Sequence, residues 1–225
     1  MLYTILQNGG NMPFWQLLLI LFSYAVLIFV MLPVHEMAHA FVAVRLGDNT
    51  PRWHGRLRFN PLAHLDLWGS LLLVLFGFGY AKPVPVNPRN FARPKRDMAL
   101  TALAGPLSNV LIALAALLLF RMVQFADLSL IVKAYAGLVL VDIIAGVSLS
   151  LAIFNLLPVP PLDGSRIFAA ILPSRWTYYM NQYQQYFTIG VMFLIATGAL
   201  NVPLRFLVHY LGGVLCAIVG LPNYF

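Results

Sequence analysis

Long runs of apolar residues recur along this chain of 225 residues, and they limit the folds that it can adopt. Hydrophobic residues make up 61% of the chain and charged residues only 9%, whereas about a quarter of an average globular domain is charged. Apolar runs of about 18 residues or more are long enough to cross a bilayer as helices. The sequence therefore predicts an all-α polytopic membrane protein, with residues 1–225 in a single membrane-embedded domain.

The expected bundle has about five or six transmembrane helices. Their apolar segments cover residues 14–46, 98–120, 133–157, 187–200 and 204–219. The first is too long for one straight span, so a kink is expected at Pro33. Residues 67–80 form a run of about 14, short for a span, and are expected to be a re-entrant or shallow element. Short extended segments are expected beside it, at residues 55–59 and 82–86.

Basic residues give the chain a formal charge of +7, and most of them lie in two loop clusters next to apolar segments. The positive-inside rule accounts for this pattern, so no nucleic-acid partner is expected and this end of the bundle is predicted to be cytoplasmic. Cys216 is the single cysteine, which excludes an intramolecular disulfide. Residues 1–12 contain no Lys or Arg, so the first apolar segment is expected to be retained rather than cleaved as a signal peptide.

Three ionisable residues lie together inside the first apolar run, in the sequence His35-Glu36-Met37-Ala38-His39. An ionisable cluster inside a membrane is costly and points to a functional site. On a helix, His35 and His39 project from one face and can share a metal ion, while Glu36 can reach a water molecule bound to that metal. The pattern H-E-x-x-H is typical of zinc metalloproteases.

A catalytic zinc site normally has three protein ligands, and Glu36 is the only glutamate in the chain. The third ligand must therefore be a histidine, an aspartate or something unusual. The candidates are His54, His64 and His209, together with Asp163, which follows a proline-broken segment and begins a new helical stretch. Four other aspartates, Asp48, Asp66, Asp97 and Asp127, lie near expected membrane edges, where a solvated carboxylate is the ordinary interpretation.

With these motifs, the chain resembles the site-2 proteases, a family of intramembrane zinc metalloproteases. It is especially similar to their short prokaryotic members without PDZ or CBS domains. The resemblance covers roughly residues 30–170 and is carried by the motifs at 35–39, 60–64, 81–88, 105–109 and 155–164. It implies that His35, His39 and Asp163 bind one zinc ion and that Glu36 is the general base.

The same resemblance implies a role for Asn155 in holding the substrate or the oxyanion, and Asn109 is a weaker candidate for such a contact. It also implies a transmembrane protein substrate, regulated intramembrane proteolysis, and a prokaryotic plasma (inner) membrane with the active site nearer the cytoplasmic face. The substrate, the oligomeric state and the roles of His64, Asp66 and Asp142 stay open.

Three other functions are weighed against this one. A prenyl-protein protease would need a downstream glutamate, which the chain lacks. A metal transporter would use intramembrane His and Asp but would rarely need Glu beside His in this order. A catalytically inactive scaffold would usually have lost one of the four site residues, and all four are present.

Overall fold

The computed structural model describes residues 13–58, 60–76 and 81–225, and every regular element within these ranges is a helix. Four segments are long and apolar enough to cross a membrane: Leu17–Arg45, Pro94–Phe125, Leu130–Asn155 and Asn201–Val219. Helix α12 (Gln184–Ala196) is a shorter apolar helix. The all-α polytopic fold is confirmed, and the described residues contain four candidate spans where about five or six were expected. The prediction for residues 1–12 lies outside the described residues.

The first span is a continuous helical path whose hydrogen-bonding pattern changes along its length. Helix α2 (Phe14–Val26) passes into a π-helical turn, η1 (Leu27–Met31), and then into α3 (Leu32–Arg45). Pro33 cannot donate a backbone hydrogen bond, and its ring crowds the preceding turn. The irregularity predicted at Pro33 therefore takes the form of a widened turn directly before it, a feature that is frequent at functional sites.

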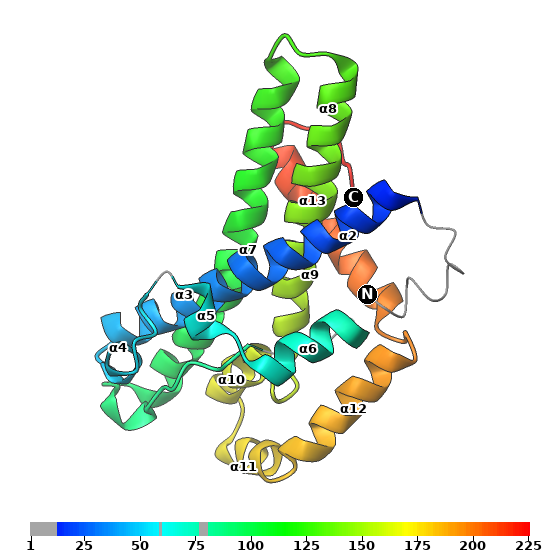
Figure 1. The fold of residues 1–225 in the computed structure, drawn as a ribbon. Helices are drawn as coiled ribbons and strands as arrows, with labels where there is room; N and C mark the ends of the chain where they lie inside the picture. Colours follow the sequence, from blue (N-terminus) through cyan, green and yellow to red (C-terminus); the bar gives the residue numbers. More distant parts are fainter. Residues whose placement is uncertain (1–12, 59, 77–80) are drawn as a thin grey trace.

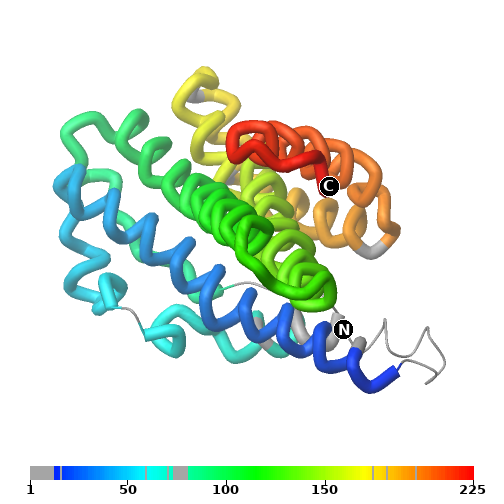
Figure 2. Tube along the Cα trace, turned by 90° about the horizontal axis from the view of Figure 1, so that it is seen from above, coloured from blue at the N-terminus to red at the C-terminus, as the bar shows by residue number. Residues whose placement is uncertain are grey.

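The longest helix, α7 (Pro94–Phe125), lies beside the first span on one side and beside the third span on the other (Figures 1 and 2). The third span combines α8 (Leu130–Gly137), the π-helical η3 (Leu138–Ala145) and α9 (Gly146–Asn155). Helix α13 (Asn201–Val219) packs against α7 and α9. The buried apolar core lies between these spans and consists of Ala113, Ala116, Leu117, Phe120, Val141, Ala145, Leu149, Leu215, Cys216 and Val219.

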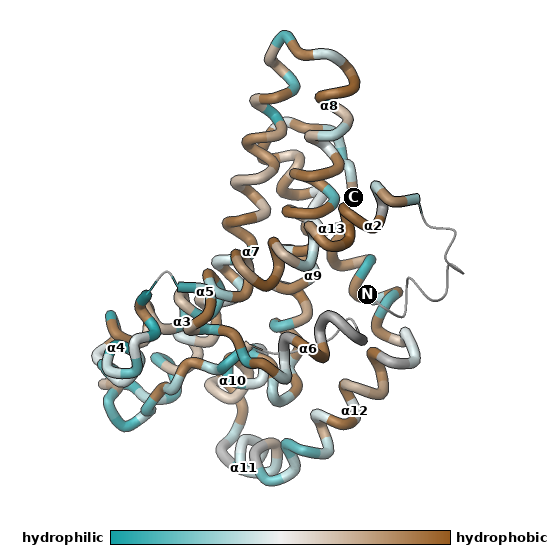
Figure 3. Tube along the Cα trace, viewed as in Figure 1, coloured by the Kyte–Doolittle hydropathy of each residue, from teal (hydrophilic) through white to brown (hydrophobic). Residues whose placement is uncertain are grey.

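Between α3 and α7 the chain forms short helices and turns. These are α4 (Thr50–Trp53), α5 (Pro61–His64), α6 (Leu67–Phe76) and a 3-10 turn, η2 (Pro88–Asn90). They are largely hydrophilic around α4, whereas α6 is apolar (Figure 3). The segment 81–87 before η2 is not helical, because its prolines disfavour helix at and before their own positions.

Helix α6 has 10 residues, which at 1.5 Å per residue is about 15 Å, or roughly half the hydrocarbon thickness of a bilayer. A re-entrant or shallow element is therefore supported for residues 67–76, whereas 77–80 lie outside the described residues. The predicted strand at 55–59 is wrong over 55–58, where the chain forms turns and bends, and Phe59 is not among the described residues. Hydrogen bonds from buried side chains, rather than strand pairing, determine the conformation of this loop.

After α9 the chain leaves the helical path for a turn at 156–162, which contains three prolines. Helix α10 (Asp163–Ile171) then begins and packs back against α7. Gly164 permits this return, because a β-carbon there would lie only 2.5 Å from the carbonyl carbon of Leu156. Helix α11 (Ser174–Gln182) connects α10 to α12. The turn thus brings Asp163 back beside α7, the helix that also packs on α3.

Candidate metal centre

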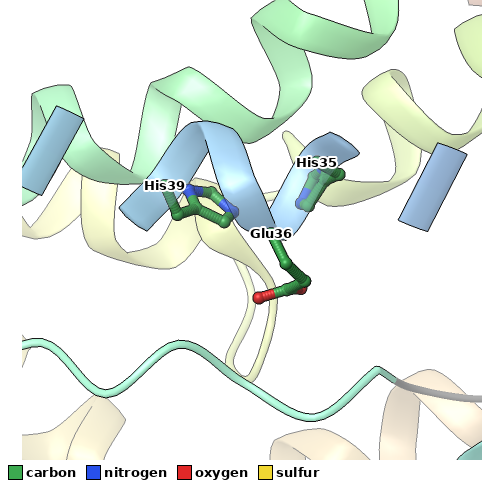
Figure 4. A group of neighbouring side chains, drawn as sticks. All are labelled: His35, Glu36 and His39. Carbon is green, nitrogen blue, oxygen red and sulfur yellow. The ribbon is translucent and has the colours of Figure 1, made fainter. Parts of the chain in front are cut away.

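The two histidines of the H-E-x-x-H motif lie one turn apart on α3, as Figure 4 shows. His35 is 3% exposed and His39 is 7% exposed, so both imidazoles are buried. Their ring centroids are 4.7 Å apart and the ring planes are nearly perpendicular, at 86°. The helical spacing therefore brings the two rings together as the sequence predicted.

Asp163 reaches both histidines from α10. Its Oδ2 atom lies 3.0 Å from His35 Nε2 and 3.2 Å from His39 Nε2. The structure therefore brings together the three side chains that the sequence proposed as ligands. They come from segments that are 128 residues apart.

Helix α7 contacts the opposite side of both imidazoles. The Nδ1 atom of His39 lies 2.7 Å from the backbone carbonyl oxygen of Thr101, and the Nδ1 atom of His35 lies 2.9 Å from Nδ2 of Asn109. Gly105 lies between these residues on the helix, and a β-carbon there would be 2.5 Å from His39 Cε1 and 2.6 Å from His35 Cε1. The close packing of α7 on α3 at Gly105 therefore leaves room for two imidazoles.

The hydrogen-bonding capacity of this cluster favours a cation between its atoms. A carbonyl oxygen can only accept, so His39 must carry its proton on Nδ1. In neutral His39 the Nε2 atom is then an acceptor that faces the carboxylate of Asp163 at 3.2 Å. Ligands bonded to a tetrahedral zinc ion at about 2.0–2.2 Å lie roughly 3.3 Å from one another. The donor set and its separations therefore fit zinc.

Glu36 is half-buried and projects from α3 between the two histidines, toward a different side of the helix (Figure 4). Its carboxylate lies near the imidazoles, since potential ligand atoms of His35, Glu36 and His39 are all within 4.8 Å of one another. Glu36 is thus close enough to the centre to act on a molecule held there.

The other candidate histidines have different partners. His54 is exposed and its Nδ1 donates to the carbonyl of Thr50 at 2.9 Å. His64 is buried, with Nε2 3.2 Å from the carbonyl of Arg58, and exposed His209 donates from Nδ1 to the carbonyl of Phe225. Asn155 donates from Nδ2 to the carbonyl of Leu151 at 3.0 Å, one turn back on α9. None of these contacts links His54, His64, His209 or Asn155 to the centre.

Two of the aspartates expected to be solvated are buried, so that expectation is wrong for Asp48 and Asp97. Asp97 is 5% exposed and accepts from the backbone N–H of Arg93 at 2.9 Å, which caps the start of α7. Asp66 accepts from the N–H of Gly69 and caps α6, but it stays partly exposed. Asp97 and Asp66 therefore stabilise the N-terminal ends of α7 and α6.

Asp48 is fully buried and organises the loop that follows α3. Its Oδ1 accepts from Thr50 and from the side chain of Asn90, and its Oδ2 accepts from the N–H of Asn87 at 2.7 Å. Burial would raise the pKa of the Asp48 carboxyl, but the hydrogen bonds from Thr50, Asn90 and Asn87 outweigh it and hold the pKa below the ordinary 3.8. Asp48 is therefore a structural anion.

Arg56 is the cationic counterpart of Asp48 in this loop, and it is 5% exposed. Its guanidinium donates to the carbonyls of Ala63 at 2.7 Å, Lys82 at 3.3 Å and Pro83 at 3.2 Å. The N–H of Lys82 also donates to the carbonyl of His64 at 2.8 Å. Arg56 and Asp48 thus fix the two ends of segment 81–87.

The contact of Thr101 with His39 and the specific role of Gly105 were not predicted from the sequence. The signal was present, because Thr101, Gly105 and Asn109 are spaced four residues apart on one helix, matching the spacing of His35 and His39. It becomes informative only when α7 is known to pack on α3. Asp48 and Arg56 had no comparable signal, since most of their partners are backbone groups or amides distant in sequence.

Comparison with known proteins gives a consistent assignment. The profile described as peptidase family M50 matches residues 132–197, which include Asn155 and Asp163. YwhC of Bacillus subtilis, named as a candidate zinc metalloprotease, is 38% identical over 165 residues, covering 73% of this chain and 75% of YwhC.

More distant relatives carry similar names. Rip2 of Mycolicibacterium smegmatis, also named as a candidate zinc metalloprotease, is 30% identical over 75% of this chain and 64% of Rip2. The zinc metalloprotease MJ0392 of Methanocaldococcus jannaschii is 27% identical over 75% of this chain, but the match covers only 38% of that longer protein. No solved structure matches the chain. The buried His and Asp cluster thus lies in a membrane protein that belongs to peptidase family M50, the site-2 protease family of zinc metalloproteases.

Proposed function

We propose that this protein hydrolyses peptide bonds in or near the transmembrane segments of other membrane proteins. The observation that carries the proposal is the approach of Asp163 Oδ2 to within 3.0 and 3.2 Å of the Nε2 atoms of His35 and His39. Both histidines lie within the first span, Leu17–Arg45. His39 is six residues from Arg45, so the proposed site is about 9 Å along the helix from the polar end.

In this proposal, His35, His39 and Asp163 hold one zinc ion. When bound there, zinc supplies Lewis acidity that polarises the scissile carbonyl and makes a water molecule more acidic. Glu36 accepts the proton of the attacking water and returns it to the leaving amine. The half-buried position of Glu36 beside the two imidazoles supports this role, because its carboxylate lies near the centre but is not part of the contacts with Asp163.

Asn155 is proposed as the donor to the oxyanion that develops on the scissile carbonyl. Its side-chain nitrogen carries two hydrogens, and the bond to the Leu151 carbonyl uses one of them. The second hydrogen can stabilise negative charge in the transition state. Asn155 also lies at the end of α9, directly before the turn that carries Asp163 toward α7.

The substrate backbone must be unwound before hydrolysis, because the carbonyls of a transmembrane helix are already hydrogen-bonded. We propose that segment 81–87 holds the unwound strand. This segment passes the site on the side toward which Glu36 projects (Figure 4). Its ends are fixed by Arg56 and Asp48, and a fixed extended backbone can pair with a substrate strand at little cost in entropy.

The proposed orientation places the site near the cytoplasmic face of a prokaryotic plasma membrane. Its support is the charge distribution, since the arginines after α3 and the basic cluster before α7 lie at the same polar end (Figure 3). Reporter fusions at the loop 126–129 and at residues 52–58 would test this orientation, and a cytoplasmic signal from 126–129 would contradict it.

The proposed reaction can be tested with purified protein in liposomes and two single-span substrates. One substrate carries its helix-breaking residues inside the membrane segment, and the other carries the same peptide in a soluble tail. The comparison includes Glu36→Gln and a matched carboxylate change, Asp127→Asn, in the loop at the opposite end of the bundle.

We expect the wild type and Asp127→Asn to cut the membrane-embedded substrate. Glu36→Gln should retain about one zinc per chain and lose roughly 10²–10⁴-fold in rate. Cleavage by Glu36→Gln at the wild-type rate would contradict the mechanism. Cleavage of the soluble tail alone would contradict the intramembrane substrate.

A further inference from the structure

Helix α7 presents three residues to the two histidines at a spacing that matches theirs. Thr101, Gly105 and Asn109 follow one another every fourth residue, as do His35 and His39. The Thr101 carbonyl meets Nδ1 of His39, the Asn109 amide meets Nδ1 of His35, and Gly105 leaves space between them. One face of α7 therefore orients both rings from the side opposite Asp163.

The two contacts differ in chemistry. A backbone carbonyl only accepts a hydrogen bond, so Thr101 holds His39 in a single tautomer with its proton on Nδ1. An asparagine side chain can either donate from its nitrogen or accept at its oxygen. Asn109 is therefore compatible with both neutral tautomers of His35.

In the present arrangement, Asn109 Nδ2 donates to Nδ1 of His35 at 2.9 Å. Nε2 of His35 then carries the proton and donates to Asp163 Oδ2 at 3.0 Å. The Asn109 side chain is 0% exposed, and among the described residues its Oδ1 atom has no hydrogen-bond partner. This oxygen is therefore not committed to another group in the described part of the chain, and it can serve His35 in a second arrangement, in which it takes the place of the amide nitrogen.

A rotation of the Asn109 amide by 180° supplies that arrangement, because the two ends of the amide occupy nearly the same space. The oxygen then accepts from Nδ1–H of His35, and Nε2 becomes a lone pair directed at the centre. Imidazoles that bind a metal through Nε2 characteristically donate Nδ1–H to such an acceptor.

We propose that Asn109 is a positioning residue that selects the tautomer of His35. With its nitrogen toward His35 it stabilises the metal-free pair with Asp163, and with its oxygen toward His35 it prepares Nε2 to bind zinc. This inference rests on the proposed role of His35 as a zinc ligand. The contact of Asn109 with the substrate stays a prediction, whereas its buried position against His35 supports the positioning role.

The test compares zinc affinity, measured by competition with a chromophoric chelator, for full-length protein in detergent. Asn109→Leu keeps the approximate volume but offers no acceptor, whereas Asn109→Asp keeps an acceptor in the same place. Ser148→Ala is the matched control, because Ser148 is also 0% exposed and lies on neighbouring α9. A thermal melt of each variant reports whether it is folded.

We expect Asn109→Leu to weaken zinc binding by roughly 10–100-fold, the usual effect of losing such a partner. Asn109→Asp and Ser148→Ala should stay within about 3-fold of the wild type. Nitrogen-15 spectra of labelled histidine should show His35 with its proton on Nδ1 in the zinc-loaded wild type and in Asn109→Asp. If Asn109→Leu does not fold, Asn109→Ala, which is smaller and also offers no acceptor, repeats the comparison.

Equal zinc affinity in Asn109→Leu and the wild type would overturn the inference, and so would a zinc-loaded His35 with its proton on Nε2. A different result would contradict the proposed function itself: wild-type protein would bind no zinc, or His35→Ala would bind zinc as tightly as the wild type does.

Discussion

Two regions of the described chain, the loop after α3 and the metal centre, bury ionisable side chains and satisfy them differently. In the loop after α3, Asp48 receives hydrogen bonds on both carboxylate oxygens and Arg56 donates to three carbonyls. At the metal centre, Asp163 Oδ2 faces two imidazole nitrogens, one of which has no proton to offer in the neutral ring. Asp48 and Arg56 find their partners within the chain, whereas the centre becomes complete with a cation.

This difference distinguishes structural from functional burial. A buried charge whose partners are all present in the chain fixes geometry, because breaking any one bond leaves a partner unsatisfied. A buried cluster with more acceptors than donors binds something else. Substitutions in the loop should therefore alter stability and substrate positioning, while substitutions at the centre should alter zinc binding.

The largest effect is expected for Gly105→Val, which fills the space between α7 and the two imidazoles. Even a β-carbon would lie 2.5 Å from His39 Cε1, so both rings must move or the helices must separate. We expect at least a 100-fold loss of zinc affinity and no measurable proteolysis. Equilibrium dialysis against radioactive zinc measures this loss. Wild-type affinity in a folded Gly105→Val protein would show that α7 does not confine the centre.

A smaller effect, on stability rather than on zinc binding, is expected for Arg56→Met in the loop. The change removes three hydrogen bonds from a buried guanidinium, and bonds to charged groups contribute about 1.5–3 kcal/mol each. Relaxation of the loop and access of water to the freed carbonyls offset part of this loss, so we expect apparent stability to fall by about 2–4 kcal/mol and segment 81–87 to exchange its amide hydrogens faster. Zinc content should stay at the wild-type level. Loss of zinc without faster amide exchange would contradict the distinction between a structural loop and a metal-binding centre.

Asp48→Asn should cost less, about 1–3 kcal/mol, because the amide oxygen keeps one of the two acceptor positions, either the one that serves Thr50 or the one that serves Asn87. The hydrogen bonds lower the pKa of Asp48 below 3.8, so its contribution is complete above that value and is lost as the pH falls through the lower folded-state pKa. The difference in melting temperature between wild type and Asp48→Asn should be constant from pH 7 to about pH 5 and shrink below about pH 4. A difference that grew on acidification would contradict the sign of the shift.

The smallest effect is expected for His54→Ala. His54 is exposed and bonds only to the carbonyl of Thr50, so neither zinc affinity nor stability should change by more than about 0.5 kcal/mol. Zinc titration and a thermal melt check both quantities. A marked loss of zinc would restore His54 as a candidate ligand and weaken the assignment of Asp163.

The sequence was sufficient to predict the polytopic helical fold, because bilayer thickness converts the length of an apolar run directly into a span. It was also sufficient to bring His35 and His39 together, since helical spacing decides this locally. The count of five or six helices was less secure, as α6 and α12 are apolar but short. The strand expected at 55–59 did not form over 55–58, where buried Arg56 directs the chain instead.

The remaining features depend on contacts between distant segments. The roles of Thr101, Gly105 and Asn109 follow from the packing of α7 on α3, which no local pattern specifies. Asp48 was expected to be solvated because it follows the end of a span, yet the chain folds back through Asn87 and Asn90 to cover it. Alternation and charge describe a residue's neighbours along the chain, whereas burial depends on its neighbours in space.

The most direct measurement of the central assignment is the zinc content of two matched variants, Asp163→Asn and Asp48→Asn, purified in parallel with the wild type. Both replace a largely buried carboxylate by an amide, one at the centre and one in the loop. We predict about one zinc per chain in the wild type and in Asp48→Asn, and a small fraction of that in Asp163→Asn. Equal zinc content in Asp163→Asn and the wild type would contradict the assignment of Asp163, and with it the site proposed here.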